Sequence, residues 1–272
     1  MLGLLMVLFS AQAFAAQQAS EPSGEGGYAL PPAAVFSLVS GKAENGDAAA
    51  MISLGRLYEH GHGVARNYSK AFEWYSKAAG KGLAEGYYNL GVCFEVGMGT
   101  VSDPPKAATV YAKAAEMGLP VAMHKMAGLY LGGTGVPRNT ATAMQFLIKA
   151  ADAGEAQACY DLGQVYMQGL YGQKQDYAAA LGYFEKGAEK GSLQAMAILA
   201  SYFDDGTPVR RNYVKALKWY LVLGRSGVQG EALATRVASL EGKMAASQVT
   251  NARTEAEDWI RQHASARGPQ FQ

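Results

Sequence analysis

Apolar, small and aromatic residues recur along most of the chain with a period close to 36 residues. A glycine marks the end of each period, and successive marking glycines lie 36, 36, 36, 37 and 36 residues apart. These glycines are Gly46, Gly82, Gly118, Gly154, Gly191 and Gly227. The pattern predicts five repeated units, at residues 47–82, 83–118, 119–154, 155–191 and 192–227. A position that is alike in all units is interpreted as scaffold, and a position that varies is open to another role.

The first half of each unit has the spacing of one face of an α-helix. A large apolar residue is followed directly by a small residue and, three positions later, by an aromatic ring, as in Leu54, Gly55 and Tyr58. The position of Ala50, four residues before Leu54, is small in every unit. These spacings of three and four place the fixed residues on one side of a helix. Small residues there let a second helix approach closely, with the ring filling the space beside them.

A fixed glycine ends this first helix, and a second helix is predicted to begin about six residues later. The ending glycines, which tolerate the left-handed conformation of a helix C-terminus, are Gly61, Gly97, Gly133, Gly169 and Gly206. The second helix begins at a short polar residue able to accept a backbone N–H as an N-cap. These residues are Asn67, Asp103, Asn139, Asp176 and Asn212. Each unit is therefore predicted to be a helical hairpin.

Neither helix of such a hairpin can bury its apolar face alone, so consecutive hairpins must stack. The predicted fold is all-α, a right-handed α/α superhelix (solenoid) of five helical-hairpin repeats with terminal capping helices. Phe36 lies 36 residues before Phe72, so residues 32–46 are interpreted as an N-terminal capping helix. Residues 228–272 are interpreted as a C-terminal cap and tail, with two helices at about Gly230 to Leu240 and Ser247 to His263.

The fixed residues resemble the Sel1-like repeat, a relative of the tetratricopeptide repeat with a longer loop between its helices. The resemblance rests on the string Leu54-Gly55-x-x-Tyr58-x-x-Gly61-x-Gly63-Val64, followed by Lys70-Ala71-x-x-Trp74-Tyr75-x-Lys77-Ala78-Ala79. The fourth unit departs in its loop, at Leu170-Tyr171-Gly172-Gln173, and the fifth has Pro208 in place of the second loop glycine. These changes concern the loop shape and leave the predicted fold unchanged. The resemblance implies a scaffold for protein complexes, of a kind often bacterial and exported, with no shared catalytic residue.

The N-terminal residues have the layout of a secretory signal peptide. An apolar run from Met1 to Phe9 precedes Ala13-Phe14-Ala15, which predicts a signal peptide at residues 1–15 with cleavage after Ala15. No Lys or Arg precedes the run, and the alternative is a buried or membrane-anchoring helix, although a run shorter than 18 residues is too short to span a bilayer. Residues 16–31 are interpreted as a flexible spacer. The expected location is periplasmic or secreted, with an intracellular scaffold and a mis-assigned start as another possibility.

Composition and charge narrow the class of partner. The chain has 272 residues and 49% apolar residues, which excludes wholesale disorder. Its 24 Lys and Arg nearly balance 23 Asp and Glu, and the net charge of +1 removes the simplest case for binding nucleic acid. We expect one or more unidentified protein or peptide partners, no nucleic acid and no stable membrane span.

The residues that most often carry chemistry do not combine into a site. Cys93 and Cys159 lie two units apart, roughly 20 Å in a stack of helical layers, too far for a disulfide. We interpret both as buried apolar residues. His60 and His62 flank a loop glycine, yet a third metal ligand is not evident. The chain lacks the regular cysteine pairs of the disulfide-rich branch of this repeat family, and it lacks the Ser-x-x-Lys motif. We therefore expect no catalytic residue, metal or cofactor.

The varying positions of the first helices trace one further stripe, which runs through Ile52 and Arg56 in the first unit. We interpret this stripe as a concave groove for a partner, with Tyr88 and Tyr160 as aromatic anchors. The candidate groove residues are Arg56, Tyr88, Asn89, His124, Lys125, Tyr160, Asp161 and Gln164. The alternative is an ordinary solvated face.

The resulting functional hypothesis is a non-enzymatic scaffold or adaptor of the bacterial cell envelope. The alternative is an envelope enzyme or a cell-wall binding protein that uses the same groove for peptidoglycan or another glycan. The absence of a nucleophile motif and of paired carboxylates in the varying stripe argues against this alternative.

Overall fold

The computed structural model describes residues 30–264, and within them the chain is built from thirteen α-helices and contains no β-strand. The predicted signal peptide and nearly all of the predicted spacer lie outside this range. The helices are α2 (Pro32–Glu44), α3 (Ala48–His60), α4 (Tyr68–Gly80), α5 (Ala84–Val96), α6 (Pro104–Glu116), α7 (Pro120–Gly132), α8 (Thr140–Asp152), α9 (Ala156–Gln168), α10 (Tyr177–Glu189), α11 (Leu193–Asp205), α12 (Tyr213–Arg225), α13 (Glu231–Glu241) and α14 (Ala246–Ala264).

Helices α3 to α12 are the ten helices predicted for the five repeats, and each of them has 13 residues. The first helix of every pair ends at its fixed glycine, whose φ lies between 66° and 76°. Four second helices begin at an Asn or Asp whose side chain accepts a backbone N–H at 3.0 or 3.1 Å. These four caps, Asn67, Asp103, Asn139 and Asn212, confirm the predicted helix starts.

A hydrogen bond that the sequence pattern does not reveal closes the loop of every hairpin. The backbone N–H of each residue at the N-cap position donates to the carbonyl of the fixed aromatic residue in the first helix, at 2.8 or 2.9 Å. The pairs are Asn67 with Tyr58, Asp103 with Phe94, Asn139 with Tyr130, Asp176 with Tyr166, and Asn212 with Phe203. The loop therefore has a defined path, which fixes how the second helix leaves the first.

The fixed positions make up the core. Leu54, Leu162 and Leu199 are completely buried, as are the alanines that face them from the second helices, such as Ala71. A Cβ on Gly91 would lie 2.6 Å from the ring of Tyr111, so the small residue is needed for the ring to pack against α5. This contact confirms the role predicted for the small positions.

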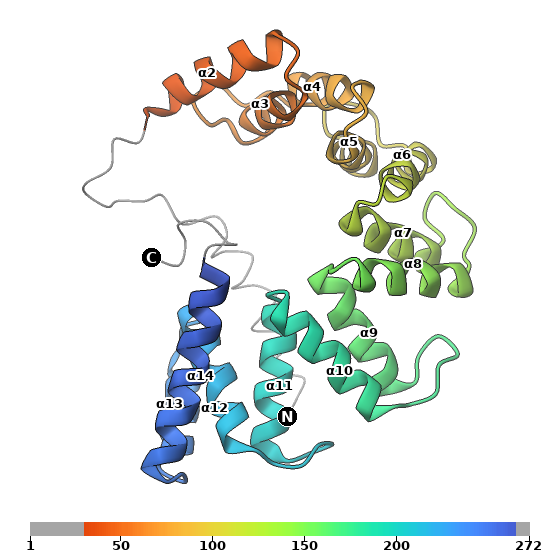
Figure 1. The fold of residues 1–272 in the computed structure, drawn as a ribbon. Coiled ribbons are helices and arrows are strands. Elements are labelled where there is room, and N and C mark those ends of the chain that lie inside the picture. Colours follow the sequence, from red (N-terminus) through yellow and green to blue (C-terminus); the bar gives the residue numbers. More distant parts are fainter. Residues whose placement is uncertain (1–29, 265–272) are drawn as a thin grey trace. The chain divides into compact units, whose positions relative to one another are not determined.

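The chain divides into two compact units, of which the first, Tyr28–Asp176, contains α2 to α9. Within it the helices follow a curved path, with α3 and α5 on the inner side (Figure 1). Helix α2 packs on α3, where the ring of Phe36 meets that of Tyr58 edge to face with 5.5 Å between centroids. The lone N-terminal helix thus occupies the place of a second helix of a preceding repeat.

The second unit comprises α10 to α14 from Tyr177 onward. Here α14 packs along α12, and the rings of Trp259 and Trp219 meet with 5.9 Å between centroids. The indole Nε1 of Trp259 donates to Oε2 of Glu189 at 2.8 Å. Helix α14 therefore covers the last hairpin as a C-terminal cap. No helix within residues 30–264 combines the length and apolar character needed to cross a bilayer.

The loops of the fourth and fifth hairpins differ from the first three, as their sequences indicate. In the first three, the second loop glycine rests against the carbonyl of the first residue of an earlier helix, Pro32, Tyr68 or Pro104. In the fourth, Tyr171 has a φ of 55°, and a Cβ on the next residue, Gly172, would meet no atom within 4 Å. The fifth loop contains a cis Thr207–Pro208 bond. These departures change local loop contacts and leave the lengths of the flanking helices unchanged.

Candidate partner-binding groove

The eight predicted groove residues all lie on first helices of the first compact unit. Arg56 is on α3, Tyr88 and Asn89 are on α5, His124 and Lys125 are on α7, and Tyr160, Asp161 and Gln164 are on α9. We call this set the groove face. Arg56 is exposed and the other seven are partly buried. Ile52, which the pattern also places on this stripe, is only 7% exposed and packs in the core beside Met51 and Leu54, so its placement on an accessible stripe is wrong.

An ion pair and a hydrogen bond join consecutive first helices across the groove face. Lys125 Nζ lies 3.1 Å from Oε2 of Glu95, which links α7 to α5. His124 Nε2 lies 2.7 Å from Oδ2 of Asp161, which links α7 to α9. The other oxygen of Asp161 accepts from Nε2 of Gln157 at 2.9 Å. Polar side chains predicted to contact a partner thus also connect three successive repeats.

Glu95 was not among the predicted residues, although the repeat carries a signal for it. The hydroxyl of Tyr111 donates to Glu95 at 2.6 Å, and that of Tyr75 donates to Glu59 at 2.5 Å. Each tyrosine follows its glutamate by 16 residues, whereas the third unit has Leu131 and Leu147 at these positions. The two positions change together, from a hydrogen-bonded pair to an apolar pair, which comparison between repeats can detect.

The two buried tyrosine hydroxyls have strongly perturbed acidities. Burial raises the pKa of Tyr75 and of Tyr111 far above the usual value near 10, and the hydrogen bond to a glutamate and its negative charge raise it further. Tyr75 is 1% exposed and Tyr111 is fully buried. Both phenols therefore stay protonated in the folded chain at a pH where they ionise in the unfolded chain.

The difference in tyrosine pKa between the folded and the unfolded chain predicts a loss of stability at alkaline pH. Above the unfolded pKa near 10, the unfolded state binds fewer protons than the folded state, so the free energy of unfolding falls as the pH rises, by up to about 1.4 kcal/mol per pH unit for each such tyrosine. Below that pH their contribution is fully present. Denaturant titrations between pH 8 and 11.5 measure the slope, and Tyr111→Phe should reduce it. An unchanged slope in Tyr111→Phe would contradict the assignment.

The predicted aromatic anchors are partly held by their own neighbours. The ring of Tyr88 packs against that of Tyr111 with 5.5 Å between centroids, and burial raises the pKa of its hydroxyl. The hydroxyl of Tyr160 accepts a hydrogen bond from Nε2 of Gln164 at 2.9 Å. Asn89 differs, because its buried Nδ2 makes no hydrogen bond within the described part of the chain. The rings of Tyr88 and Tyr160 are therefore fixed in orientation before any partner binds.

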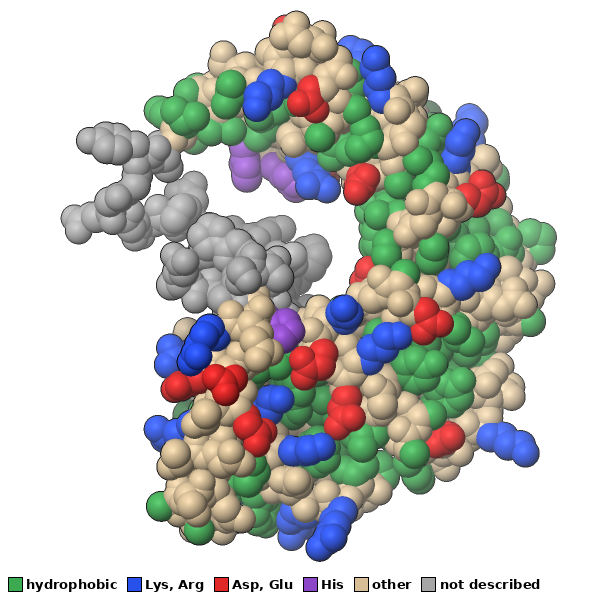
Figure 2. Space-filling model, in the orientation of Figure 1, with side chains coloured by type: hydrophobic (Ala, Val, Ile, Leu, Met, Phe, Trp, Pro, Cys, Tyr) green, Lys and Arg blue, Asp and Glu red, His purple; other side chains and the backbone are tan. Residues whose placement is uncertain are grey.

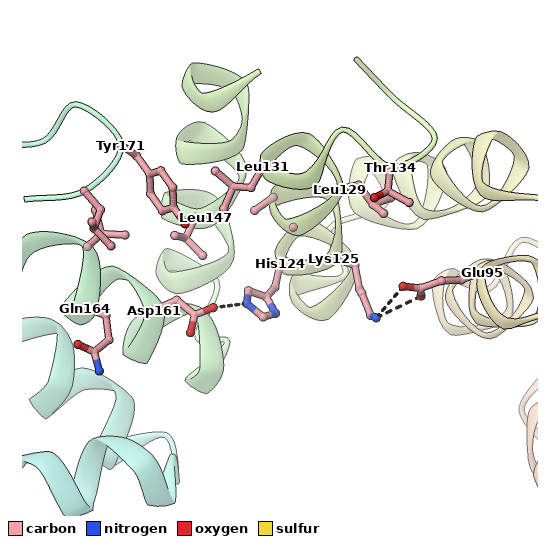
Figure 3. Close-up of a pocket in the computed structure, with 14 residues that line it drawn as sticks. Glu95, His124, Lys125, Leu129, Leu131, Thr134, Leu147, Asp161, Gln164 and Tyr171 are labelled. Carbon is pink, nitrogen blue, oxygen red and sulfur yellow. Dashed lines mark hydrogen bonds and ion pairs between the residues drawn. The ribbon is translucent and has the colours of Figure 1, made fainter. Parts of the chain in front are cut away.

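A hollow of about 560 Å³ opens between α7 and α9 (Figure 3). We call it the α7–α9 hollow. Apolar side chains line much of its wall, namely Leu129, Leu131, Leu147, Val165, Leu170 and the ring of Tyr171. Polar residues of the groove face and Glu95 also line it, namely His124, Lys125, Asp161 and Gln164. Four of the eight predicted residues thus meet at one place, whereas Arg56, Tyr88, Asn89 and Tyr160 do not line this hollow.

Cys93 and Cys159 pack in the core, whereas His60 and His62 are exposed. Cys93 and Cys159 are both buried, and burial raises the pKa of the Cys93 thiol to about 12, which makes it a poor nucleophile at neutral pH. The rings of His60 and His62 lie 5.7 Å apart and are tilted by 40°. Between residues 30 and 264, no group of three or more His, Cys, Asp or Glu side chains is arranged to hold a metal ion.

The fold and the groove face define a class of protein, an α-solenoid of stacked helical hairpins that presents a surface of variable residues. The chain belongs to the Sel1 repeat family, because the family model matches residues 48–83, 84–119, 120–155, 156–192 and 193–224. The match confirms the resemblance and the five repeats. Proteins of this family generally mediate protein–protein interactions, and the fold is typically a non-enzymatic scaffold.

Solved structures of bacterial proteins share this fold. A Sel1 repeat protein from Oxalobacter formigenes is 28% identical, with a TM-score of 0.64, and the match covers 85% of this chain and 99% of that one. The immunity protein Pa5087 from Pseudomonas aeruginosa is 24% identical, with a TM-score of 0.52 and coverage of 95% and 88%. The immunity protein PA5088 from the same organism is 20% identical, with a TM-score of 0.54 and coverage of 85% and 81%. The two immunity proteins support the fold alone. No curated protein matches this chain.

Proposed function

We propose that this protein is a non-enzymatic scaffold that binds a segment of a partner protein along the groove face and acts in the bacterial cell envelope. The observation that carries the proposal is the division between fixed and variable positions. Fixed residues such as Leu54 and Leu162 are fully buried in the stacked hairpins, whereas the variable groove-face residues keep part of their surface accessible. Variable residues on a rigid scaffold are where a repeat protein places its specificity.

The groove face is preorganised for this role. The ion pair of Lys125 with Glu95 and the hydrogen bond of His124 with Asp161 hold side chains of α5, α7 and α9 in place before binding. Preorganisation lowers the entropy lost when a partner binds. Positive and negative side chains are interspersed over the visible face of the molecule, without a large patch of one sign (Figure 2). This mixture favours a protein segment over a polyanion such as nucleic acid.

The envelope location rests on the predicted signal peptide. Residues 1–15 have the sequence of an export signal, and cleavage is expected after Ala15. Mass spectrometry of the mature protein from its native cells tests this part of the proposal. A protein that begins after Ala15 supports export, and a protein that retains Met1 contradicts it.

Loss of the groove-face tyrosines is expected to abolish partner capture. The immobilised protein is incubated with an envelope extract of the native organism, and captured proteins are identified by mass spectrometry. Tyr88→Ala combined with Tyr160→Ala should reduce capture of the wild-type partner by at least about tenfold, because rigid aromatic side chains often dominate binding energy. Tyr68→Ala combined with Tyr177→Ala is the matched control, since it removes two exposed tyrosines from second helices.

A second variant separates binding from folding, because Tyr88 also packs on the buried Tyr111. Arg56→Ala with Gln164→Ala removes two groove-face side chains that lie outside the buried core. Circular dichroism should match that of the wild type, while capture of the same partner falls. Unchanged capture by both groove variants would overturn the groove assignment. Saturable binding or turnover of peptidoglycan fragments would instead favour the cell-wall alternative.

A further inference from the structure

We propose that the α7–α9 hollow is the specificity pocket of the groove, and that it receives a bulky apolar side chain next to a lysine or arginine in the bound segment. This inference rests on the proposed function, because it names the partner chemistry of the same face. Four features of the hollow support it: its apolar wall, the glycine that opens it, the fourth loop beside it and the charge around it.

The wall of the hollow is apolar because the third repeat replaces a polar pair. In the first two repeats a tyrosine donates to a glutamate across the hairpin, from Tyr75 to Glu59 and from Tyr111 to Glu95. The third repeat has Leu131 and Leu147 instead, and both side chains line the hollow (Figure 3). A ligand group that enters here meets hydrocarbon, so an aliphatic or aromatic side chain gains most from burial.

The hollow is open because one repeat position lacks a side chain in the third repeat. The position that is Arg56, Val92 and Gln164 in the first, second and fourth repeats is Gly128 in the third. Gly128 is exposed, and a Cβ built on it would meet no atom within 4 Å. Neither close packing nor a left-handed backbone therefore requires a glycine at this helical position. The glycine instead leaves open a space that a longer side chain would occupy.

The fourth loop forms another part of the hollow. Leu170 is 37% exposed and Tyr171 is 40% exposed, and both lie among its lining residues. In the first three repeats, the second residue after the helix-ending glycine is another glycine that rests on an earlier helix, as Gly63 rests on Pro32. Tyr171 occupies this position in the fourth repeat. The departure in the fourth loop therefore adds accessible apolar surface beside the hollow opened by Gly128.

The charge around the hollow selects a basic neighbour for the apolar side chain. The carboxylates of Glu95 and Asp161 line the hollow with 31% and 36% of their side chains exposed, against one permanent cation, Lys125. A lysine or arginine of the bound segment complements this excess of carboxylate. An aspartate or glutamate at the same place would be repelled. The structure thus points to a basic and apolar segment.

A peptide selection tests the proposal and does not require the partner to be identified first. A phage-displayed library of random twelve-residue peptides is selected on the full chain, and the enriched peptides are synthesised and titrated. We expect enrichment of sequences in which Leu, Phe, Trp or Met lies beside Lys or Arg. Enrichment of acidic peptides, or of peptides without a bulky apolar residue, would overturn the proposal.

Filling the hollow should weaken binding of the enriched peptides by at least about tenfold. Gly128→Phe fills it with a ring, and Gly128→Gln fills it with the residue that the fourth repeat carries at this position. Ala141→Phe is the matched control, because it adds the same ring at an exposed position of α8 outside the hollow. Asp161→Asn should weaken the same peptides, whereas Glu116→Gln, at an exposed position of α6, should not.

The variants separate failure of the pocket from failure of the proposed function. If both Gly128 variants bind the peptides normally while Tyr88→Ala with Tyr160→Ala does not, the pocket assignment fails and the groove stands. If no groove-face or hollow variant changes binding, both fail. If selected peptides lose affinity only in the Gly128 and Asp161 variants, the pocket is supported on its own.

Discussion

Replacing Gly135 by alanine is expected to lower the free energy of unfolding by about 3 kcal/mol, which combines two independent costs. The glycine has a φ of 71°, and an L-residue loses about 1–2 kcal/mol in this left-handed conformation. A Cβ would also overlap the backbone carbonyl of Pro104, the first residue of α6, which cannot move without shifting the helix. Overpacking of this kind costs about 1–3 kcal/mol. Guanidinium denaturation followed by circular dichroism measures the change.

Gly118→Ala provides a control that separates the two costs. Gly118 has a similar φ of 88°, but a Cβ there would meet no atom within 4 Å. Gly118→Ala should lower the free energy of unfolding only by the cost of the left-handed conformation, about 1–2 kcal/mol. Equal losses in the two variants would show that the contact between the loop and the preceding repeat contributes nothing.

Replacing either Glu95 or Tyr111 alone is expected to lower the free energy of unfolding by about 2 kcal/mol. Glu95→Leu leaves the fully buried hydroxyl of Tyr111 without its acceptor, and an unsatisfied buried donor costs about 1–3 kcal/mol. Tyr111→Leu removes a buried ring and leaves space behind it. The double variant introduces the apolar pair that the third repeat already uses, Leu131 with Leu147. The loss in free energy of unfolding of the double variant should therefore be about 1–2 kcal/mol smaller than the sum of the two single losses.

A double-mutant cycle from denaturant titrations gives this coupling energy. Lys125→Met serves as a control for the other partner of Glu95, because the lysine is 38% exposed and its ion pair should contribute little to stability. A coupling energy near zero would mean that the carboxylate does not satisfy the tyrosine. If the effects of the two substitutions were strictly additive, coupling between the two positions would not explain why they are both polar in the first two repeats and both apolar in the third.

Much of the fold could be predicted because its determinants are local. A cap such as Asn67 bonds within its own helix start, and a glycine such as Gly61 ends a helix through its own backbone conformation. The pairing of the two helices within a hairpin follows from fixed small positions, since Gly55 and Gly91 lie directly against the buried tyrosine rings of the second helices. Repetition makes these signals stronger, because five copies of one unit act as an internal comparison.

The groove-face residues lie on first helices, as their spacing predicts, but the contacts of their side chains depend on distant residues. The pairing of Lys125 with Glu95 joins residues 30 positions apart, and that of His124 with Asp161 joins residues 37 apart. A helical stripe does not show which rotamers meet across repeats. Ile52 was wrongly placed because the boundary between a buried and an accessible face depends on the neighbouring helices. The α7–α9 hollow was missed because it arises from an absent side chain, at Gly128.

Site-specific photo-crosslinking tests the central claim, that a partner binds along the groove face. A benzophenone amino acid is introduced at Gln164 on the groove face, and separately at Gln145, a glutamine exposed on α8 that serves as the matched control. Both variants are irradiated in native cells, and crosslinked products are identified by mass spectrometry. We expect a specific crosslinked protein from position 164 and none from position 145. Equal crosslinking from both positions, or crosslinking from position 145 alone, would contradict it.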